Sequence, residues 1–148
     1  MTVKCQAIVD VKGLRDLPPR YRKAADDANR LIAERCWTYA RANIRVGAGD
    51  GPHTRDTVYL RTLSINGRTG YAVGTDSPVG TYLEQGTRPH IIRPVRAKAL
   101  RFEVNGEVVF ARLVHHPGTR PYPWLMPAFE RAVNETLPVL LGIVQRAR

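Results

Sequence analysis

The spacing of apolar positions predicts a strand followed by a long helix in the first third of the chain. Every second residue from Val3 to Val11 is apolar or small, which indicates a half-buried strand. From Tyr21 to Val46 apolar residues recur at helical spacing, and Asp16, Pro18 and Pro19 mark the entry to a helix. A helix of about 28 residues would be about 42 Å long. Because this is long for a chain of 148 residues, we expect one end to project or to pack on another subunit.

The next segment predicts a loop and a β-hairpin. Residues Gly47–Thr57 include three Gly, one Pro and almost no apolar residue, so we expect a loop. The alternating stretches Thr57–Ile65 and Thr69–Thr75 are joined by Asn66-Gly67, which is a strong signal for a tight hairpin turn.

Two further helices are predicted by their boundary residues. Ser77 and Pro78 are suited to the start of a short helix, and Gly86 is suited to its end. A final apolar stripe runs from Leu125 to Val144. Because Pro138 lies inside that stripe, we expect a kink or a break there.

A second hairpin lies between two proline-rich segments. Residues Leu100–Val104 and Val108–Arg112 alternate around Asn105-Gly106, which predicts a two-residue turn with positive φ. Prolines at positions 89, 94, 117, 121 and 123 disfavour helix on both sides. We therefore expect a hairpin carried on extended arms over about residues 87–121, used for contacts with neighbours.

Together these elements predict one domain of the α+β class spanning residues 1–148. A long N-terminal helix and a C-terminal helix should pack on a small, mostly antiparallel sheet, with the hairpin projecting from it.

Composition narrows the classes of partner. The net charge is +10, and all but four of the 23 basic residues are Arg. Arg suits phosphate or carboxylate partners, although genomic base composition also explains an excess of Arg over Lys. The two cysteines form no disulfide framework, which indicates a reducing compartment. The apolar run Val139–Val144 is too short to span a bilayer, and the chain does not open on a signal peptide, so we expect a soluble protein with no membrane partner.

Candidate catalytic groups lack the partners that they would need. His115 and His116 are adjacent, so on a strand they point to opposite faces and do not share a metal ion. Asp26 and Asp27 are neighbours in a predicted helix, so their side chains point in different directions and do not form a pair of catalytic carboxylates. Glu84 lies in the short helix, but the sequence indicates no partner base that a general acid at this position would need. We therefore expect no catalytic residue, no metal ligand and no cofactor, and thus a protein that is not an enzyme.

The stretch from Arg88 to Arg101 is basic and contains no acidic residue. Its charged residues are Arg88, Arg93, Arg96, Lys98 and Arg101. Such a stretch can follow a phosphate backbone, dock on an acidic protein surface or be a solvated arm. Because no groove-reading motif accompanies it and aromatic residues are few, docking on protein or a nonspecific basic surface is the favoured interpretation.

Several motifs, in order, resemble those of one family. Residues 73–76 (Val-Gly-Thr-Asp) followed by 82–87 (Tyr-Leu-Glu-Gln-Gly-Thr) resemble the strand, short helix and Glu-x-Gly-Thr signature of the phage tail-component family, the gene-ten-like neck and tail-completion proteins of long-tailed phages. The similarity continues through His90–Pro94, Lys98–Phe102, His116–Thr119 and the Pro-aromatic-Leu-x-Pro-Ala entry at Pro123–Phe129. It covers about half of the chain, and the loop Gly47–Asp56 and Pro138 depart from it.

The resemblance implies a structural virion protein at the junction of head and tail. It implies a homo-oligomeric ring, expected to be a hexamer, that contacts other neck, tail-terminator or connector proteins, in the virion after assembly and in the host cytoplasm before it. Whether DNA in the channel touches the subunit stays open, and the alternative function is a basic, nonspecific nucleic-acid-binding protein. Gly86-Thr87 and Gly118-Thr119 would be the hinges at which the arm leaves the body. The residues expected to contact protomers or neighbours are Glu84, Gly86, Thr87, Arg88, Arg93, Arg96, Lys98, Phe102, Asn105, Gly106, Phe110 and Trp124.

Overall fold

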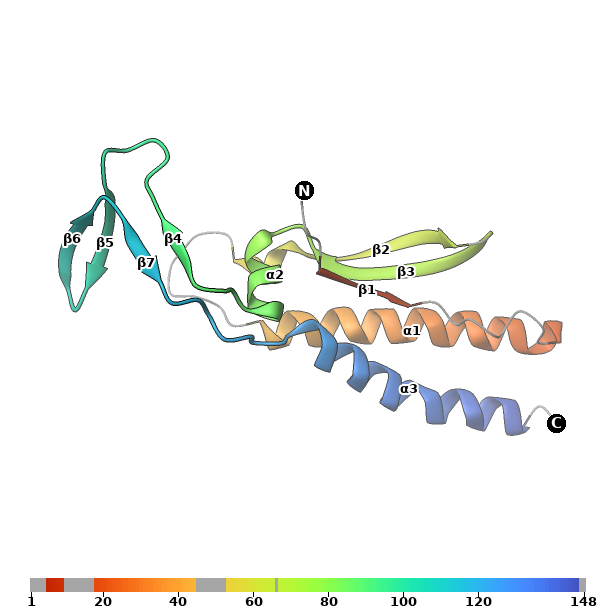
Figure 1. Cartoon of the computed structure of the whole chain (residues 1–148). Helices are drawn as coiled ribbons and strands as arrows, with labels where there is room; N and C mark the ends of the chain where they lie inside the picture. The colour runs from red at the N-terminus through yellow and green to blue at the C-terminus, as the bar shows by residue number, and fades with distance from the viewer. Residues whose placement is uncertain (1–4, 10–17, 45–52, 66, 147–148) are drawn as a thin grey trace.

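A helical body and a projecting arm make up the chain (Figure 1). The computed structural model describes residues 5–9, 18–44, 53–65 and 67–146. The body contains α1 (Pro19–Asn43), η2 (Thr54–Thr57), α2 (Pro78–Gln85), α3 (Leu125–Arg146) and the strands β1 (Cys5–Val9), β2 (Val58–Ile65) and β3 (Arg68–Thr75). The arm contains β4 (His90–Ile92), β5 (Leu100–Val104), β6 (Glu107–Ala111) and β7 (Val114–His116). The predicted α+β class is confirmed.

Helix α1 begins where the prolines predict and ends earlier than expected. Pro18 is its N-cap residue and Pro19 its first residue, where a missing N–H costs nothing. The helix ends at Asn43 because Ile44 is extended, so it has 25 residues rather than about 28. Val46 and Asp16, which the prediction included, lie outside the described residues.

The body sheet has the order β1-β3-β2, and both pairings are antiparallel. Ile65 pairs with Arg68, so β2 and β3 are joined by a two-residue turn with Gly67 at φ +76°, as predicted. Asn66 lies outside the described residues, as do the ends of the predicted strand Val3–Val11 and residues 47–52 of the predicted loop. The rest of that loop includes the single 3₁₀ turn η2.

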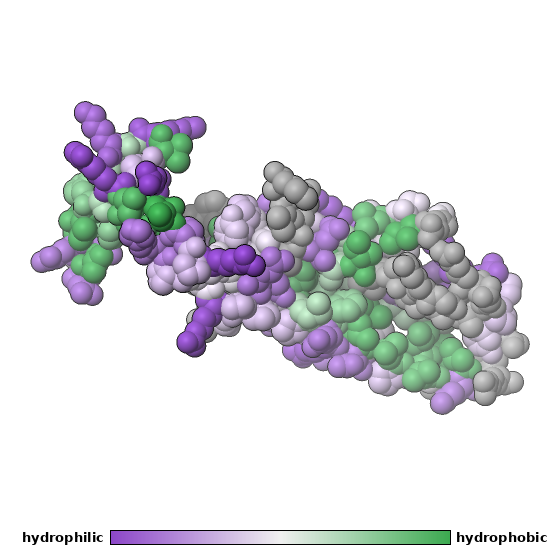
Figure 2. Space-filling model, viewed as in Figure 1, coloured by the Kyte–Doolittle hydropathy of each residue, from purple (hydrophilic) through white to green (hydrophobic). Residues whose placement is uncertain are grey.

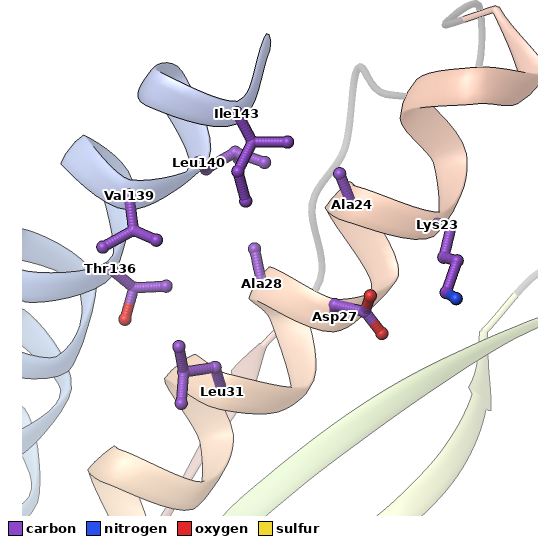
Figure 3. A pocket seen from close by; sticks show the side chains of 9 residues that line it. All are labelled: Lys23, Ala24, Asp27, Ala28, Leu31, Thr136, Val139, Leu140 and Ile143. Atoms are coloured by element: carbon purple, nitrogen blue, oxygen red, sulfur yellow. The ribbon is translucent and has the colours of Figure 1, made fainter. Parts of the chain in front are cut away.

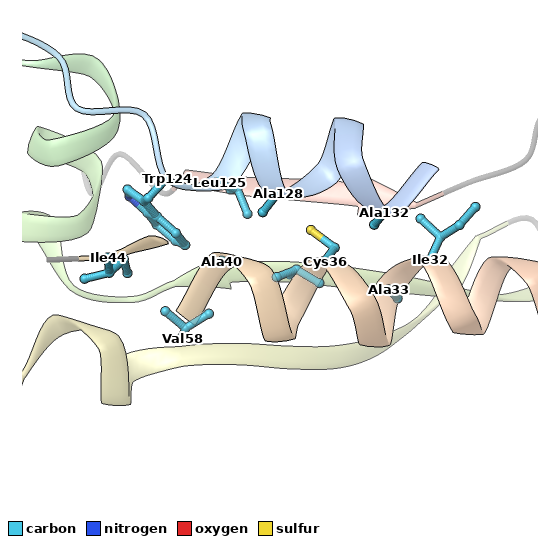
Figure 4. Packing of buried hydrophobic residues seen from close by; sticks show 11 residues of the cluster. Ile32, Ala33, Cys36, Ala40, Ile44, Val58, Trp124, Leu125, Ala128 and Ala132 are labelled. Atoms are coloured by element: carbon cyan, nitrogen blue, oxygen red, sulfur yellow. The ribbon is translucent and has the colours of Figure 1, made fainter. Parts of the chain in front are cut away.

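The core lies where α1 passes between the sheet and α3 (Figure 4). Small buried residues lie where the helices meet: Cys36 of α1 and Ala128 and Ala132 of α3, whereas Ala33 is on the side of α1 that faces the sheet. Small side chains let helix backbones approach closely, so the two helices stack directly on each other.

Helix α3 continues through Pro138, so of the two predicted outcomes the break is wrong and the kink stays a prediction. A proline inside a helix removes one backbone hydrogen bond and its ring crowds the carbonyl one turn earlier, so packing elsewhere must offset this cost. Two residues before Pro138, the buried Thr136 hydroxyl donates to the carbonyl of Ala132 at 2.7 Å and accepts from Arg35 at 3.0 Å. Leu137 and Ile143, expected on the buried stripe, are exposed, so the second half of α3 leaves apolar surface uncovered.

Candidate interaction surface

The base of the arm is a ladder between the two Gly-Thr pairs. Thr87 and Thr119 exchange two backbone hydrogen bonds, N–H to carbonyl, at 2.9 and 3.0 Å. β4 and β7 continue the same antiparallel register, with His90 opposite His116. That register places Pro89 opposite Pro117, and since proline has no N–H, the ladder is interrupted only between these two residues.

Two glycines allow the strands to meet at this joint. Gly86 and Gly118 have φ values of +71° and +88°, in the left-handed region that favours glycine. A Cβ on Gly86 would lie 2.5 Å from the carbonyl oxygen of Thr119, and one on Gly118 would overlap the carbonyl oxygen of Thr87. Each glycine thus leaves room for the backbone of the opposite strand, and the two predicted hinge positions form one joint.

Glu84 and Trp124 attach the joint to the body. One carboxylate oxygen of Glu84 accepts the backbone N–H groups of Trp124 and Leu125 at 2.7 and 2.8 Å, and the other accepts that of Met126 at 3.0 Å. The next residue, Pro127, has no N–H. The carboxylate therefore satisfies the free donors at the start of α3 and places a negative charge at its positive end.

The structure corrects the role expected for two of these residues. The Trp124 side chain is 0% exposed, and its indole N–H donates to the carbonyl of Gly80 in α2 at 2.8 Å. The side chain therefore belongs to the core of its own chain. Both carboxylate oxygens of Glu84 are engaged within the chain, so this side chain positions α3 instead of offering a docking group.

A histidine pair lies above the joint. The rings of His90 and His116 stack with centroids 4.9 Å apart. The backbone N–H of Gly118 donates to Nδ1 of His116 at 3.0 Å, and Nδ1 of His90 lies 2.9 Å from the carbonyl oxygen of Arg88. Nδ1 of His116 is therefore the acceptor nitrogen of the ring. These histidines were not paired in the sequence analysis. The mirrored order of Gly-Thr-Arg-Pro-His and His-Pro-Gly-Thr was the signal that the two lie opposite each other.

Three of the basic residues of the arm lie in the longer of its two connections. Seven residues, 93–99, join β4 to β5, but only two, 112 and 113, join β6 to β7. The longer connection bulges away from the ribbon in Figure 1 and carries Arg93, Arg96 and Lys98. All three are exposed and form no ion pair with a described residue.

The tip of the arm is the hairpin of β5 and β6. Asn105 and Gly106 have φ values of +53° and +85°, which confirms the predicted turn with two positive φ values. Leu100, Phe102 and Val104 lie opposite Ala111, Val109 and Glu107, and residues directly opposite share a face. This makes one face mainly apolar. Phe110, the second predicted aromatic contact, lies on the other face opposite Arg101, and every residue from 101 to 110 is exposed.

Of the other predicted residues, Gly86 and Thr87 lie at the joint, and the rest lie along the arm: Arg88, Arg93, Arg96, Lys98, Phe102, Asn105, Gly106 and Phe110. Arg88 leads from the joint into β4. Among the described residues, no three His, Cys, Asp or Glu side chains gather as a metal-ligand set, and no helix is long and apolar enough to cross a membrane.

Comparison with known proteins provides no relative for this chain. No protein-family model matches it, and no curated protein or solved structure matches it significantly.

Proposed function

We propose that the chain is a structural subunit of a virus particle that forms a ring joining the tail to the head. The motif order from Ile65 to Phe129, with its resemblance to neck and tail-completion proteins, supports the place in the particle. The ring is a homo-oligomer, expected to have six copies, and its partners are other neck, tail-terminator or connector proteins. Before assembly, the subunit is located in the host cytoplasm.

The observation that carries this proposal is the uncovered hairpin tip. A two-stranded hairpin is at best marginally stable alone in water, and both faces of this one are exposed. It is nevertheless held away from the body by a joint with constrained glycines and by paired strands. Such an arm is suited to receive its missing contacts from a neighbouring subunit.

The test removes the tip without disturbing the joint. In the variant, residues 92–114 are replaced by Asn-Gly, so that a two-residue turn closes on the pair of Ile91 and His115 and β4 and β7 keep their observed register. The full chain should form closed rings in native mass spectrometry and imaging and should restore head–tail joining to particles that lack it. The shortened chain should stay folded but remain a monomer and fail to restore joining. Normal joining by the shortened chain would contradict the proposal.

A second candidate function rests on the exposed basic bulge. Arg93, Arg96 and Lys98 have no acidic partner among the described residues, which suits a nonspecific nucleic-acid-binding protein. A protein of that class would retain duplex DNA as a monomer, with affinity falling steeply as salt rises. A ring that binds tails at salt concentrations that release DNA favours the structural role.

A further inference from the structure

Helices α1 and α3 diverge toward the end of the body that lies opposite the arm, and a groove opens between them (Figures 1 and 3). Its volume is about 300 Å³. Ala24, Ala28 and Leu31 of α1 face Val139, Leu140 and Ile143 of α3 across it. Lys23, Asp27 and Thr136 also line it, so the groove is a mainly apolar hollow with polar groups along it.

The opposite end of the chain, the tip of the arm, also has an exposed apolar surface. Figure 2 shows apolar side chains on the arm and again at the far end of the body, with polar surface between them. The hairpin face formed by Leu100, Phe102, Val104, Val109 and Ala111 has nothing packed on it. Since the arm points away from the body, the tip does not reach the groove of its own chain.

We propose that the hairpin tip of each copy docks in the α1–α3 groove of the next copy. This inference rests on the proposed ring and names its contact. Each copy supplies one tip and one groove. In a closed ring of head-to-tail contacts, every tip is therefore docked in the groove of a neighbour. It also gives the isolated hairpin the additional packing layer that it lacks.

Charged residues lie at the edge of both surfaces. Glu107 is the one charged residue on the apolar face of the hairpin, and Lys23 and Asp27, one of each sign, both line the groove. A docked tip must therefore bring Glu107 beside Lys23 and away from Asp27, which restricts its orientation in the groove.

Disulfide cross-linking between two differently tagged chains tests the contact. Both chains carry Cys5→Ser, and Cys36 is buried. One chain carries Val109→Cys on the apolar face of the tip, and the other carries Val139→Cys in the groove. Val108→Cys is the matched control, because Val108 and Val109 are neighbours with similar exposure, 47% and 37%, on opposite faces of the hairpin.

Mild oxidation should join position 109 of one chain to position 139 of the other at least ten times faster than position 108. A disulfide formed mainly between two copies of position 109, or equal rates for 108 and 109, would overturn the inference. So would cross-linking of position 139 only to a different protein of the particle.

A second pair of variants separates this inference from the proposed function. Val139→Asp places a charge in the groove, whereas Leu141→Asp places one on the same helix outside it, at exposures of 49% and 59%. Val139→Asp should abolish the ring and leave a folded monomer, and Leu141→Asp should still assemble. If both variants assemble like the unchanged chain, the tip–groove contact is wrong while the ring stands. If the unchanged chain forms no ring in solution or in particles, both are wrong.

Discussion

Glu84 and Trp124 are 40 residues apart in the chain, yet the carboxylate of Glu84 accepts the backbone N–H of Trp124 at 2.7 Å. Through this bond and those to Leu125 and Met126, a side chain of α2 caps α3. The same segment of backbone connects α3 to the arm. The direction of the arm and the start of the last helix are therefore set by one contact.

Removal of this cap should destabilise the whole body. We expect Glu84→Ala to lower the free energy of unfolding by about 1–2 kcal/mol, because the donors at the start of α3 lose a charged acceptor. Urea denaturation followed by circular dichroism measures the change. Glu130→Ala is the control, since Glu130 is an exposed glutamate of α3 that forms no hydrogen bond with a described residue. Equal urea midpoints for the two variants would contradict the capping role.

Replacing Gly118 with alanine should disrupt the joint of the arm, whereas replacing Gly106 with alanine should leave the hairpin intact. Both have nearly the same φ, +88° and +85°, but an added Cβ meets open space at Gly106 and the Thr87 carbonyl at Gly118. Gly106→Ala should cost only the strain of positive φ, about 1 kcal/mol. Gly118→Ala should in addition separate the strands and speed hydrogen exchange of the Thr87 and Thr119 amides by at least tenfold. Unchanged exchange of these amides in Gly118→Ala would show that the joint tolerates a side chain.

Acid should weaken a polar contact between α1 and α3. The Tyr39 hydroxyl donates to Glu135 at 2.6 Å and Arg131 donates at 2.8 Å, and these bonds lower the pKa of Glu135 below its usual 4.5. A carboxylate whose folded pKa is lowered stabilises the native state above its unfolded pKa, and this stabilisation is lost as the pH falls through the folded pKa. Glu135→Gln should therefore reduce stability at neutral pH and have little effect at about pH 2.

Urea denaturation of Glu135→Gln at the two pH values provides the measurement. Tyr39→Phe should move the pKa of Glu135 back toward its usual value in a carboxyl NMR titration, because the first donor is gone. A loss of stability in Glu135→Gln that is the same at both pH values would mean that the contact acts through packing and not through charge.

The thiol of Cys36 should be unreactive in the native protein. Its side chain is fully buried between α1 and α3, and burial raises its pKa to about 12. In a Cys5→Ser background, a thiol reagent at about pH 8 should label Cys36 only as fast as the body unfolds. Added urea should accelerate labelling, and rapid labelling without denaturant would contradict the packing of this core.

The basic bulge should contribute to assembly and not to folding. Changing Arg93, Arg96 and Lys98 together to Gln should leave the urea midpoint unchanged and impair head–tail joining or genome retention. If the bulge contacts phosphates, the slope of log affinity for DNA against log salt should fall by about 3. Arg30, Arg55 and Arg68 changed to Gln remove the same charge from the body and should have little effect. Normal infectivity of the first variant would mean that the bulge is a solvated arm.

Local chemistry in the sequence determined the elements and their boundaries. Pro18 and Pro19 open α1, Pro78 and Gly86 bound α2, and Asn105-Gly106 closes the tip hairpin, because these residues restrict or permit φ without help from distant residues. The arm itself follows from proline spacing, since extended backbone is what those prolines allow.

Only the tertiary structure determined which contacts these elements make with one another. Glu84 and Trp124 were expected at an interface, and distant backbone groups instead hold the first as a helix cap and the second in the core. Helix α3 continues through Pro138, where local chemistry predicted a kink or a break. The joint of Gly86 with Gly118 and the groove between α1 and α3 arise from residues more than 30 positions apart. Local propensity carries no information about such contacts, because they depend on how close two backbones come after packing.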